Sequence, residues 1–333
     1  MECSLIPKFL ISNIGVNLGG SFVSIKHIIE ILDLLDDPKV SGPAVAEYLK
    51  SYGADNIWVK HLTGEKGSTD FLKILIPGRN GKTEGKNCPT LGIVGRLGGL
   101  GARPQRLGFT SDGDGALTVL AVAAKLSQMR SRGDVLDEDV IITTHICPNA
   151  PTRQNESVLF MDAPISSEEA NVYEVDPAMD AIFCVDTTKG NRIVNQRGFA
   201  ISPTVKEGYI LRTSEQLLSL MEIATGRLPF VLPLSQQDIT PYGNGIFHLN
   251  SILQPSVATK APCVGVAITT ETKVPGCATG ASHVADIDEC ARFLIEAAKV
   301  FANSPDLFYK AEEYNKLLAL YGPLSRFQTF GEK

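Results

Sequence analysis

The sequence predicts an α/β fold in which helices cover both faces of a mostly parallel or mixed sheet, giving three layers. The first observation is an alternation of helix and strand, because residues 116–129 have helical periodicity and the apolar run 140–144 follows after a turn. The second is a pair of later continuous apolar runs, 181–185 and 263–268, which read as buried strands. The third is a long helix over 286–301 that can cover such a sheet.

The N-terminal part predicts two helices followed by three strands. Apolar residues recur at helical spacing from position 25 to 35, which predicts a helix that ends before Pro38. A second helix is expected to begin near Ser41, with Pro43 in its first turn, and to stop at Gly53. The predicted strands then cover residues 57–62, 71–76 and 91–97, and the last of them enters the glycine-rich stretch GGLGARPQR.

The C-terminal part continues the pattern. Extended structure is expected at residues 199–201, and Thr213 with Gln216 forms a capping-box pair that predicts the start of a helix ending at Gly226. A last helix is expected over residues 305–320. We therefore expect a loose extension over residues 1–23 and a single α/β domain over 24–333, with the weakly periodic stretch 148–180 read as an excursion over the sheet edge.

Composition narrows the class of partner. The net charge is −6, basic residues are scattered and aromatic residues make up only 7%, which excludes the electrostatic footprint of a nucleic-acid or anionic-membrane protein. The seven cysteines are odd in number and include no CxxC pair, so they predict reduced thiols rather than disulfides or a zinc ribbon. No signal peptide or membrane segment is recognisable. We expect a cytoplasmic homo-oligomer that acts on a small molecule or peptide.

Metal-capable or acid–base side chains end or closely follow four predicted strands. They are Asp112 with Asp114 in SDGDG, His145 in TTHICPNAP, Asp186 in FCVDTTKG and His283 in GCATGASH. Because the carboxyl ends of parallel strands meet at one edge of a sheet, we expect these residues to line one pocket. Carboxylate and imidazole together make the ligand set of zinc, manganese or iron(II) hydrolase sites.

Each of these residues also has a structural interpretation. One aspartate of SDGDG can serve as a helix cap, and a histidine at a strand end is often a hydrogen-bonded structural residue. Asp186 ends an apolar strand, where an unpaired charge is costly, so it requires either the donors of Thr187, Thr188 and Lys189 or a metal. The enzyme hypothesis therefore depends on the four strand ends taken jointly.

The sequence resembles the prokaryotic family labelled domain of unknown function 1177 over essentially residues 25–301. The resemblance is carried by these stretches: GEKGSTDFLKILIPG, GRLGGLGARP, SDGDGA, TTHICPNAP, VDPAMDAIFCVDTTKGNRIVNQRGFAISPTVKEGYILR, QDITPYGNG, HLNSILQPS and VPGCATGASH. It implies family membership and no particular chemistry.

In the order of its elements, the chain is also similar to the co-catalytic zinc aminopeptidase and deacylase superfamily, with its zinc-exopeptidase (phosphorylase/hydrolase-like) fold. That likeness implies metal ligation by Asp112 or Asp114, Asp186 and His283, with His145 at the position of the general base. The chain departs from the superfamily at Gly95-Arg96-Leu97, which replaces an early His-x-Asp, and at Thr144-His145, which replaces paired glutamates. Strict spacing to Gly115 would put Ser111 in the bridging position. One metal, a changed metal or no metal are all compatible with these departures.

The function expected from these observations is metal-assisted hydrolysis of an amide bond in a small peptide or an N-acyl amino acid, with zinc as the expected divalent metal. His145 would act as base or as a further ligand. Arg96, Arg103 and Arg106 would hold a substrate carboxylate through paired donors, unless they are ordinary loop residues. Two alternatives stay open: a binding protein that kept the fold without catalysis, and a metal-free thiol enzyme that uses Cys147 or Cys277.

Overall fold

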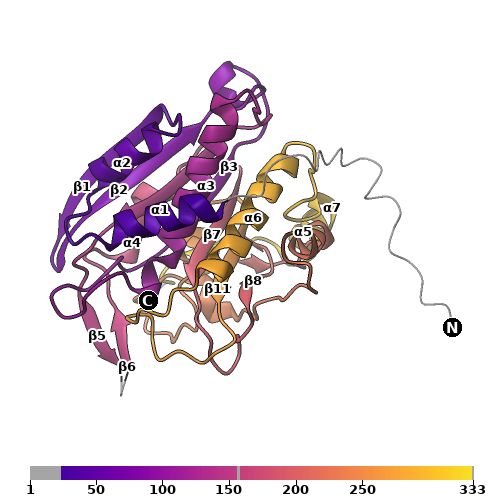
Figure 1. Ribbon diagram of the computed structural model, residues 1–333. Coiled ribbons are helices and arrows are strands. Elements are labelled where there is room, and N and C mark those ends of the chain that lie inside the picture. Colours follow the sequence, from indigo (N-terminus) through magenta and orange to yellow (C-terminus); the bar gives the residue numbers. More distant parts are fainter. Residues whose placement is uncertain (1–23, 156–157, 332–333) are drawn as a thin grey trace.

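The computed structural model describes residues 24–155 and 158–331, so the predicted extension over residues 1–23 lies outside the described residues. Nine strands of the described part form one mixed sheet (Figure 1). Their order along the sheet is β1 (Asn56–Gly64), β2 (Gly67–Ile76), β4 (Val140–Ile146), β3 (Leu91–Gly95), β7 (Ala181–Thr187), β11 (Cys263–Thr269), β9 (Val205–Lys206) and β10 (Tyr209–Ile210), and β8 (Gly198–Ile201) pairs with β11.

The centre of the sheet is parallel and its flanks are antiparallel. β3 runs parallel to both β4 and β7, and β7 runs parallel to β11. β2 is antiparallel to β4, β1 to β2, and β8 to β11. The loops that follow the four parallel strands therefore leave from one edge of the sheet, which we call the carboxyl edge.

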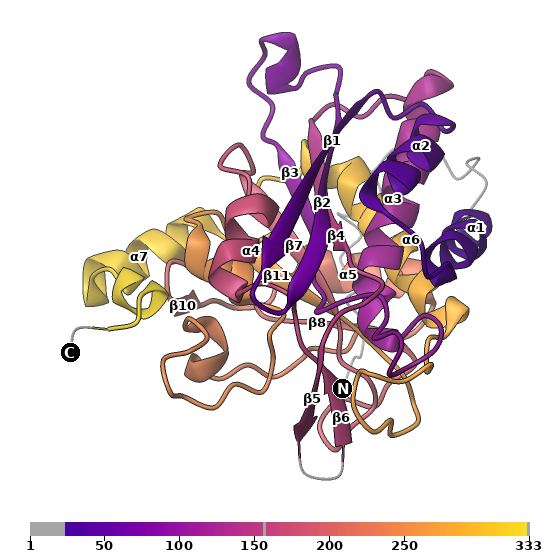
Figure 2. The ribbon, with the colours of Figure 1, turned by 90° about the vertical axis from the view of Figure 1, so that its left-hand side faces the viewer.

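Helices cover both faces, which confirms the predicted three-layer α/β class. Figure 2 views the strands nearly edge-on, with α1, α2, α3, α5 and α6 on one side and α4 and α7 on the other. The bounds of these helices are α1 Ile25–Asp36, α2 Gly42–Lys50, α3 Asp114–Ser131, α4 Ser167–Glu174, α5 Glu215–Thr225, α6 Val284–Phe301 and α7 Ala311–Tyr321. Helices α1, α5 and α3 all pack against α6.

Two apolar cores lie on the two faces of the sheet. In β7, Phe183 and Val185 belong to the larger core under α3 and α6, whereas Ile182 and Cys184 belong to the core on the opposite face. This alternation is the period-2 geometry of a strand that is covered on both sides. Asp186 continues the register of Ile182 and Cys184, so the strand itself directs this carboxylate toward the α4 side of the sheet.

Two helix starts differ from the sequence prediction. Ser214, not Thr213, caps α5, because its hydroxyl accepts the backbone N–H of Gln216 at 3.2 Å. The last helix begins at Ala311 and not near residue 305, because the preceding segment turns inward: Phe308 is buried, and its ring lies 4.7 Å from that of Phe183. Tertiary packing outweighs local helical periodicity at this point.

The weakly periodic stretch 148–180 contains a β-hairpin and α4. The hairpin consists of β5 (Thr152–Asn155) and β6 (Val158–Met161), and in Figure 2 it projects beyond the carboxyl edge. Gly276 permits the loop after β11 to approach this hairpin, since a Cβ there would lie 2.5 Å from the Leu159 carbonyl oxygen. Within the described residues, no helix has the length and apolar character needed to cross a membrane.

Candidate active site

Asp112 is held in the carboxyl-edge cluster by the glycine-rich loop that follows β3. One of its carboxylate oxygens accepts the backbone N–H groups of Gly98 at 2.6 Å and Gly99 at 2.8 Å. Glycine is needed in this loop because a Cβ on Gly98 would lie 3.1 Å from that oxygen and 2.7 Å from the Asp162 carbonyl. Asp112 is thus bound across the loop and does not cap α3, whose N-cap is Gly113.

Burial raises the pKa of Asp112 to about 6, although its hydrogen bonds to Gly99, Cys277 and Gly98 favour the ionised form. The carboxyl of Asp186, at the end of β7, is also buried, and its pKa is raised more than that of Asp112. Burial, with a smaller contribution from the negative charge of Asp112, raises its pKa to about 7. The two carboxyls therefore interact electrostatically.

The donors around Asp186 come from the chain beside it and from a distant loop. The backbone N–H of Thr187 donates to one carboxylate oxygen at 2.7 Å, and the Ser251 hydroxyl donates to the other at 2.9 Å. Tyr242, from the same loop as Ser251, is close enough for the Asp186 charge to contribute to its raised pKa, which burial brings to about 12. Lys189, which the sequence analysis considered as a donor to Asp186, forms an ion pair with Asp114 instead.

Lys189 forms a buried ion pair with Asp114. The ammonium lies 2.5 Å from the carboxylate, and the two side chains are 3% and 0% exposed. The Ser282 hydroxyl also donates to Asp114, at 2.5 Å. Burial raises the pKa of Asp114, while the charge of Lys189 opposes that rise. Of the two aspartates in SDGDG, only Asp112 is left without a cationic side chain bound to it.

His145 lies at the carboxyl end of β4, but its imidazole is enclosed. The Thr69 hydroxyl is 2.7 Å from Nδ1, and the carbonyl of Leu97 is 3.0 Å from Nε2. Because a carbonyl can only accept, Nε2 donates to Leu97 and Nδ1 accepts from Thr69 in the neutral ring. Burial lowers the pKa of His145, which favours that neutral form. Both ring nitrogens are therefore hydrogen-bonded, and through Leu97 the imidazole stabilises the loop whose Gly98 and Gly99 bind Asp112.

His283 lies on the same edge but outside the buried cluster. Its side chain is 51% exposed, and its Nδ1 is 3.3 Å from Asp286. It lines a pocket of about 370 Å³ together with Arg197, Thr270, Glu271, Thr272, Val284, Ala285 and Asp286. Asp112 is therefore within electrostatic range of both Asp114 and Asp186, whereas His145 is enclosed by Thr69 and Leu97, and His283 lies at an exposed rim.

The three arginines proposed for substrate binding lie in different surroundings. Arg96 is buried and paired with Glu174, a residue of α4. Arg103 bonds to the backbone carbonyl and the carboxylate of Asp36, and Arg106 is exposed. Arg153, which the sequence did not single out, is exposed on the β5–β6 hairpin, and its charge reaches both Tyr242 and Asp162.

The two candidate thiols are not activated. Burial raises the pKa of Cys147 to about 11, and its Sγ donates to the Ser68 carbonyl at 3.3 Å. Burial also raises the pKa of Cys277, with a further rise from the Asp112 charge. A reactive thiolate requires the opposite, an electropositive setting. The six cysteines of the described residues are free, as the sequence predicted.

The donor set does not match a zinc site with three protein ligands. Across residues 24–155 and 158–331, no group of three or more His, Cys, Asp or Glu side chains is arranged to hold a metal ion. Asp114 is bound to Lys189, and His283 faces Asp286. Asp112 and Asp186, which interact electrostatically, are two carboxyls without a bonded cationic side chain, and carboxylate oxygen is the donor type that hard cations prefer.

Comparison with known proteins identifies relatives in family and fold. The model of the family described as "Protein of unknown function (DUF1177)" matches residues 60–331. No curated protein matches the sequence.

Solved enzymes show a similar fold. The bottromycin maturation enzyme BotP aligns with a TM-score of 0.50 and 16% identity, over 84% of this chain and 70% of that chain. The same enzyme in complex with Mn aligns with a TM-score of 0.50 and 14% identity, over 84% and 71%. A Caenorhabditis elegans leucine aminopeptidase gives a TM-score of 0.49 and 12% identity, over 83% and 65%. The likeness to BotP shows that this chain shares the α/β fold of that enzyme.

Proposed function

We propose that this chain, which belongs to the DUF1177 family, hydrolyses an amide bond in a small peptide or an N-acyl amino acid at the carboxyl edge of its sheet. One observation carries the proposal. Asp112 and Asp186 are both buried, their pKa values are raised to about 6 and about 7, and the charge of Asp112 contributes to the rise at Asp186. The nearby cations are committed, since Lys189 is paired with Asp114 and Arg96 with Glu174. Perturbed, uncompensated carboxyls at this edge of an α/β sheet are typical of reactive sites.

The two carboxyls suit different parts of an acid–base reaction. Asp112 accepts two backbone N–H groups, which favour its ionised form, so we assign it the role of base toward a water molecule. Asp186 has the higher pKa, so we assign it the proton that a leaving amine requires while no cation is bound, and a bound cation would displace that proton. Two carboxyls whose surroundings separate their pKa values can divide the roles in this way.

We also propose that a divalent cation binds at this pair. Asp112 and Asp186 leave two negative charges without a cationic partner, which a single divalent ion would neutralise. When bound, such an ion polarises the substrate carbonyl and lowers the pKa of a bound water. The all-oxygen donor pair favours magnesium or manganese over the zinc that the sequence resemblance implies, because zinc prefers nitrogen and sulfur ligands. BotP, which has the same fold, was solved with Mn.

The remaining features of the proposal concern the substrate and its setting. The exposed Arg153 beside the site would bind a substrate carboxylate, a role that the buried Arg96 cannot reach. A peptide-sized substrate agrees with the net charge of −6, which offers nothing to polyanions. Free cysteines support a cytoplasmic setting.

The test combines cation binding with amide hydrolysis. Metal-stripped protein is titrated with Mn²⁺, Mg²⁺ and Zn²⁺ by calorimetry, and a panel of aminoacyl amides and N-acyl amino acids is assayed for release of amine. Asp112→Asn and Asp186→Asn are each expected to lose the cation and roughly 10²–10⁴-fold of the rate. Asp176→Asn serves as the matched control, because Asp176 pairs with Lys73 away from the site. Activity that survives both site substitutions would overturn the proposal, and cation binding without any hydrolysis would favour the binding-protein alternative.

A further inference from the structure

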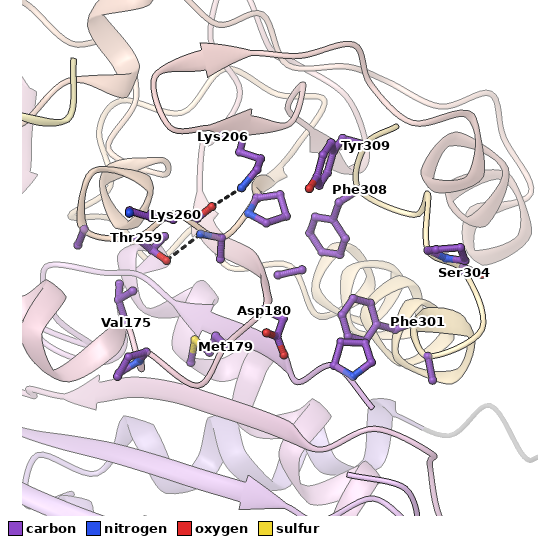
Figure 3. A pocket seen from close by; sticks show the side chains of 18 residues that line it. Val175, Met179, Asp180, Lys206, Thr259, Lys260, Phe301, Ser304, Phe308 and Tyr309 are labelled. Atoms are coloured by element: carbon purple, nitrogen blue, oxygen red, sulfur yellow. Dashed lines mark hydrogen bonds between the residues drawn. The ribbon is translucent and has the colours of Figure 1, made fainter. Parts of the chain in front are cut away.

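A second cavity opens at the opposite, amino edge of the sheet. Its volume is about 750 Å³, within the range of small-molecule sites. Its walls are the segments that lead into β7 and β11, the end of α6 and the segment after α6 (Figure 3). None of Asp112, Asp114 and Asp186 is among its lining residues. Whatever occupies this cavity therefore binds separately from the proposed reaction site.

One part of the cavity is apolar and already formed. Met179, Phe301 and Phe308 line it and are themselves almost fully buried. The Phe308 ring is locked between two others, with centroids 6.0 Å from Phe301 and 4.7 Å from Phe183. Pro177, Pro262 and Pro305 stiffen the entrances to the same space. A ligand needs an apolar body to cover these rings.

A carboxylate faces the same space. Figure 3 shows Asp180 between Met179 and Phe301, with its carboxylate directed into the cavity. Its two bonds, from the Thr90 backbone N–H at 2.6 Å and from Lys82 at 2.5 Å, both fall on Oδ2, so Oδ1 remains an acceptor. The C-terminal end of α6 at Phe301 and Ala302 also lines the cavity, and the negative end of a helix dipole favours a positive group. This side of the cavity suits an ammonium.

Two lysines supply the opposite charge at another part of the wall. The Lys206 ammonium donates to the backbone carbonyl of Lys260 at 2.6 Å, which ties the segment before β11 to β9 (Figure 3). Lys206 is largely buried and its ammonium also lies 3.3 Å from the Glu207 carboxylate, so the more available charge is that of Lys260, which is exposed at the rim. A purely cationic amphiphile would meet these lysines, and a purely anionic one would meet Asp180 and the helix end. A ligand with both charges satisfies both parts of the wall.

We propose that this amino-edge cavity is a second binding site for a small zwitterion with an apolar body, the chemistry shared by apolar amino acids and short apolar peptides with free ends. The ammonium binds Asp180, the carboxylate lies toward Lys206 and Lys260, and the side chain covers Phe301 and Phe308. The inference goes beyond the proposed hydrolysis and does not depend on it, because the two sites lie on opposite edges of the sheet.

Calorimetry with ligands that contain no amide bond tests this site without involving hydrolysis. L-Phenylalanine is expected to bind, and both phenethylamine, which lacks the carboxylate, and 3-phenylpropanoic acid, which lacks the ammonium, should bind at least about tenfold more weakly. Equal binding of the three compounds, or no binding of phenylalanine at millimolar concentration, would refute the zwitterion site.

Substitutions then locate the binding. Ala258 is an exposed lining residue, so Ala258→Trp should fill the cavity mouth and abolish phenylalanine binding without disturbing the core. Ala311→Trp is the matched control, since Ala311 is exposed at the start of α7 and does not line the cavity. Asp186→Asn should leave phenylalanine binding unchanged even where it removes hydrolysis. Binding that survives Ala258→Trp, or that disappears in Asp186→Asn, would place the ligand elsewhere and overturn the proposal.

Discussion

The two edges of the sheet differ in two properties: the carboxyl edge contains the buried ionisable residues, and the amino edge contains the larger cavity. At the carboxyl edge, Asp112, Asp114, Asp186 and Lys189 are all buried, and the pocket beside them has about 370 Å³. At the amino edge the cavity has about 750 Å³, and the ion pair of its Asp180 with Lys82 is exposed. The larger of these two cavities therefore does not lie at the edge where the buried aspartates gather. In this fold, perturbed charge and cavity volume identify two different sites.

The difference follows from the direction of the strands. Each parallel strand delivers its last residue and the following loop to the carboxyl edge, so polar residues from four loops converge there. The amino edge receives the segments that enter the strands. Two of these segments carry prolines that line the cavity and have a fixed backbone φ angle: Pro177 lies in a turn before β7, and Pro262 directly precedes β11.

The largest expected effect tests the buried charge of the carboxyl edge. Lys189→Met leaves the Asp114 carboxylate buried without its cation, and we expect the free energy of unfolding to fall by about 3–5 kcal/mol. Adding Asp114→Asn should restore most of that loss, because the double variant no longer contains a buried charge. Chemical denaturation of the wild type, both single variants and the double variant measures the coupling between the two residues.

The amino edge supplies the matched control for that experiment. Lys82 and Asp180 are also 2.5 Å apart, but their side chains are 44% and 43% exposed. Lys82→Met should therefore cost no more than about 1 kcal/mol. Similar losses in Lys82→Met and Lys189→Met would remove the distinction between the two edges.

A second effect of similar size is a pH dependence that comes from the carboxyl edge. In the folded protein the pKa values of Asp112 and Asp186 are raised from 3.8 to about 6 and about 7. Between the unfolded and folded pKa values, the folded state binds more protons than the unfolded state. The free energy of unfolding should therefore fall as pH rises from about 4 to about 7, by about 3 kcal/mol for Asp112 and about 4 kcal/mol for Asp186 when each is taken singly.

Two comparisons check the origin of this pH dependence. The double variant Asp112→Asn/Asp186→Asn should unfold with a flatter pH profile in urea titrations from pH 4 to pH 8. Added Mn²⁺ should stabilise the wild type most at the high end of that range, where both carboxylates are ionised, because binding to the folded state raises stability. An identical pH profile in the double variant would show that these carboxyls do not carry the charge strain assigned to them.

From the sequence, the sheet edge on which the candidate residues lie could be predicted, but the contacts between their side chains could not. Asp186 could be placed at this edge because it ends the apolar run of β7, and Asp112 because it lies in the loop between β3 and the next helix, since the carboxyl ends of parallel strands converge. Their partners could not be predicted in the same way. Lys189 stands three residues after Asp186, yet it binds Asp114 from another loop. A strand has a visible period of two, but the contact between two loops depends on packing that leaves no local periodicity.

The same limit explains the missed residues. Ser251, which donates to Asp186, lies in HLNSILQPS, and Tyr242 lies in QDITPYGNG, two stretches that marked the family without indicating a contact. Glu174 pairs with Arg96 from α4, inside the weakly periodic stretch. The available signal for this pair was the position of Arg96 directly after an apolar strand, because a guanidinium that is buried there requires a carboxylate partner. Its partner required the fold.

The smallest expected effect decides whether His283 belongs to the buried cluster or to the open rim beside it. The imidazole is 51% exposed and contacts Asp286 at 3.3 Å, so His283→Ala should change the free energy of unfolding by less than about 1 kcal/mol. Bound Mn²⁺ should be unchanged, because Asp114, the aspartate of SDGDG that the charge of His283 reaches, is committed to Lys189. Elemental analysis and the thermal midpoint are measured together, with Asp186→Asn as the variant expected to lose the ion. Loss of Mn²⁺ in His283→Ala with an unchanged midpoint would make His283 a ligand, as the sequence resemblance implies, and would extend the reactive site across the rim.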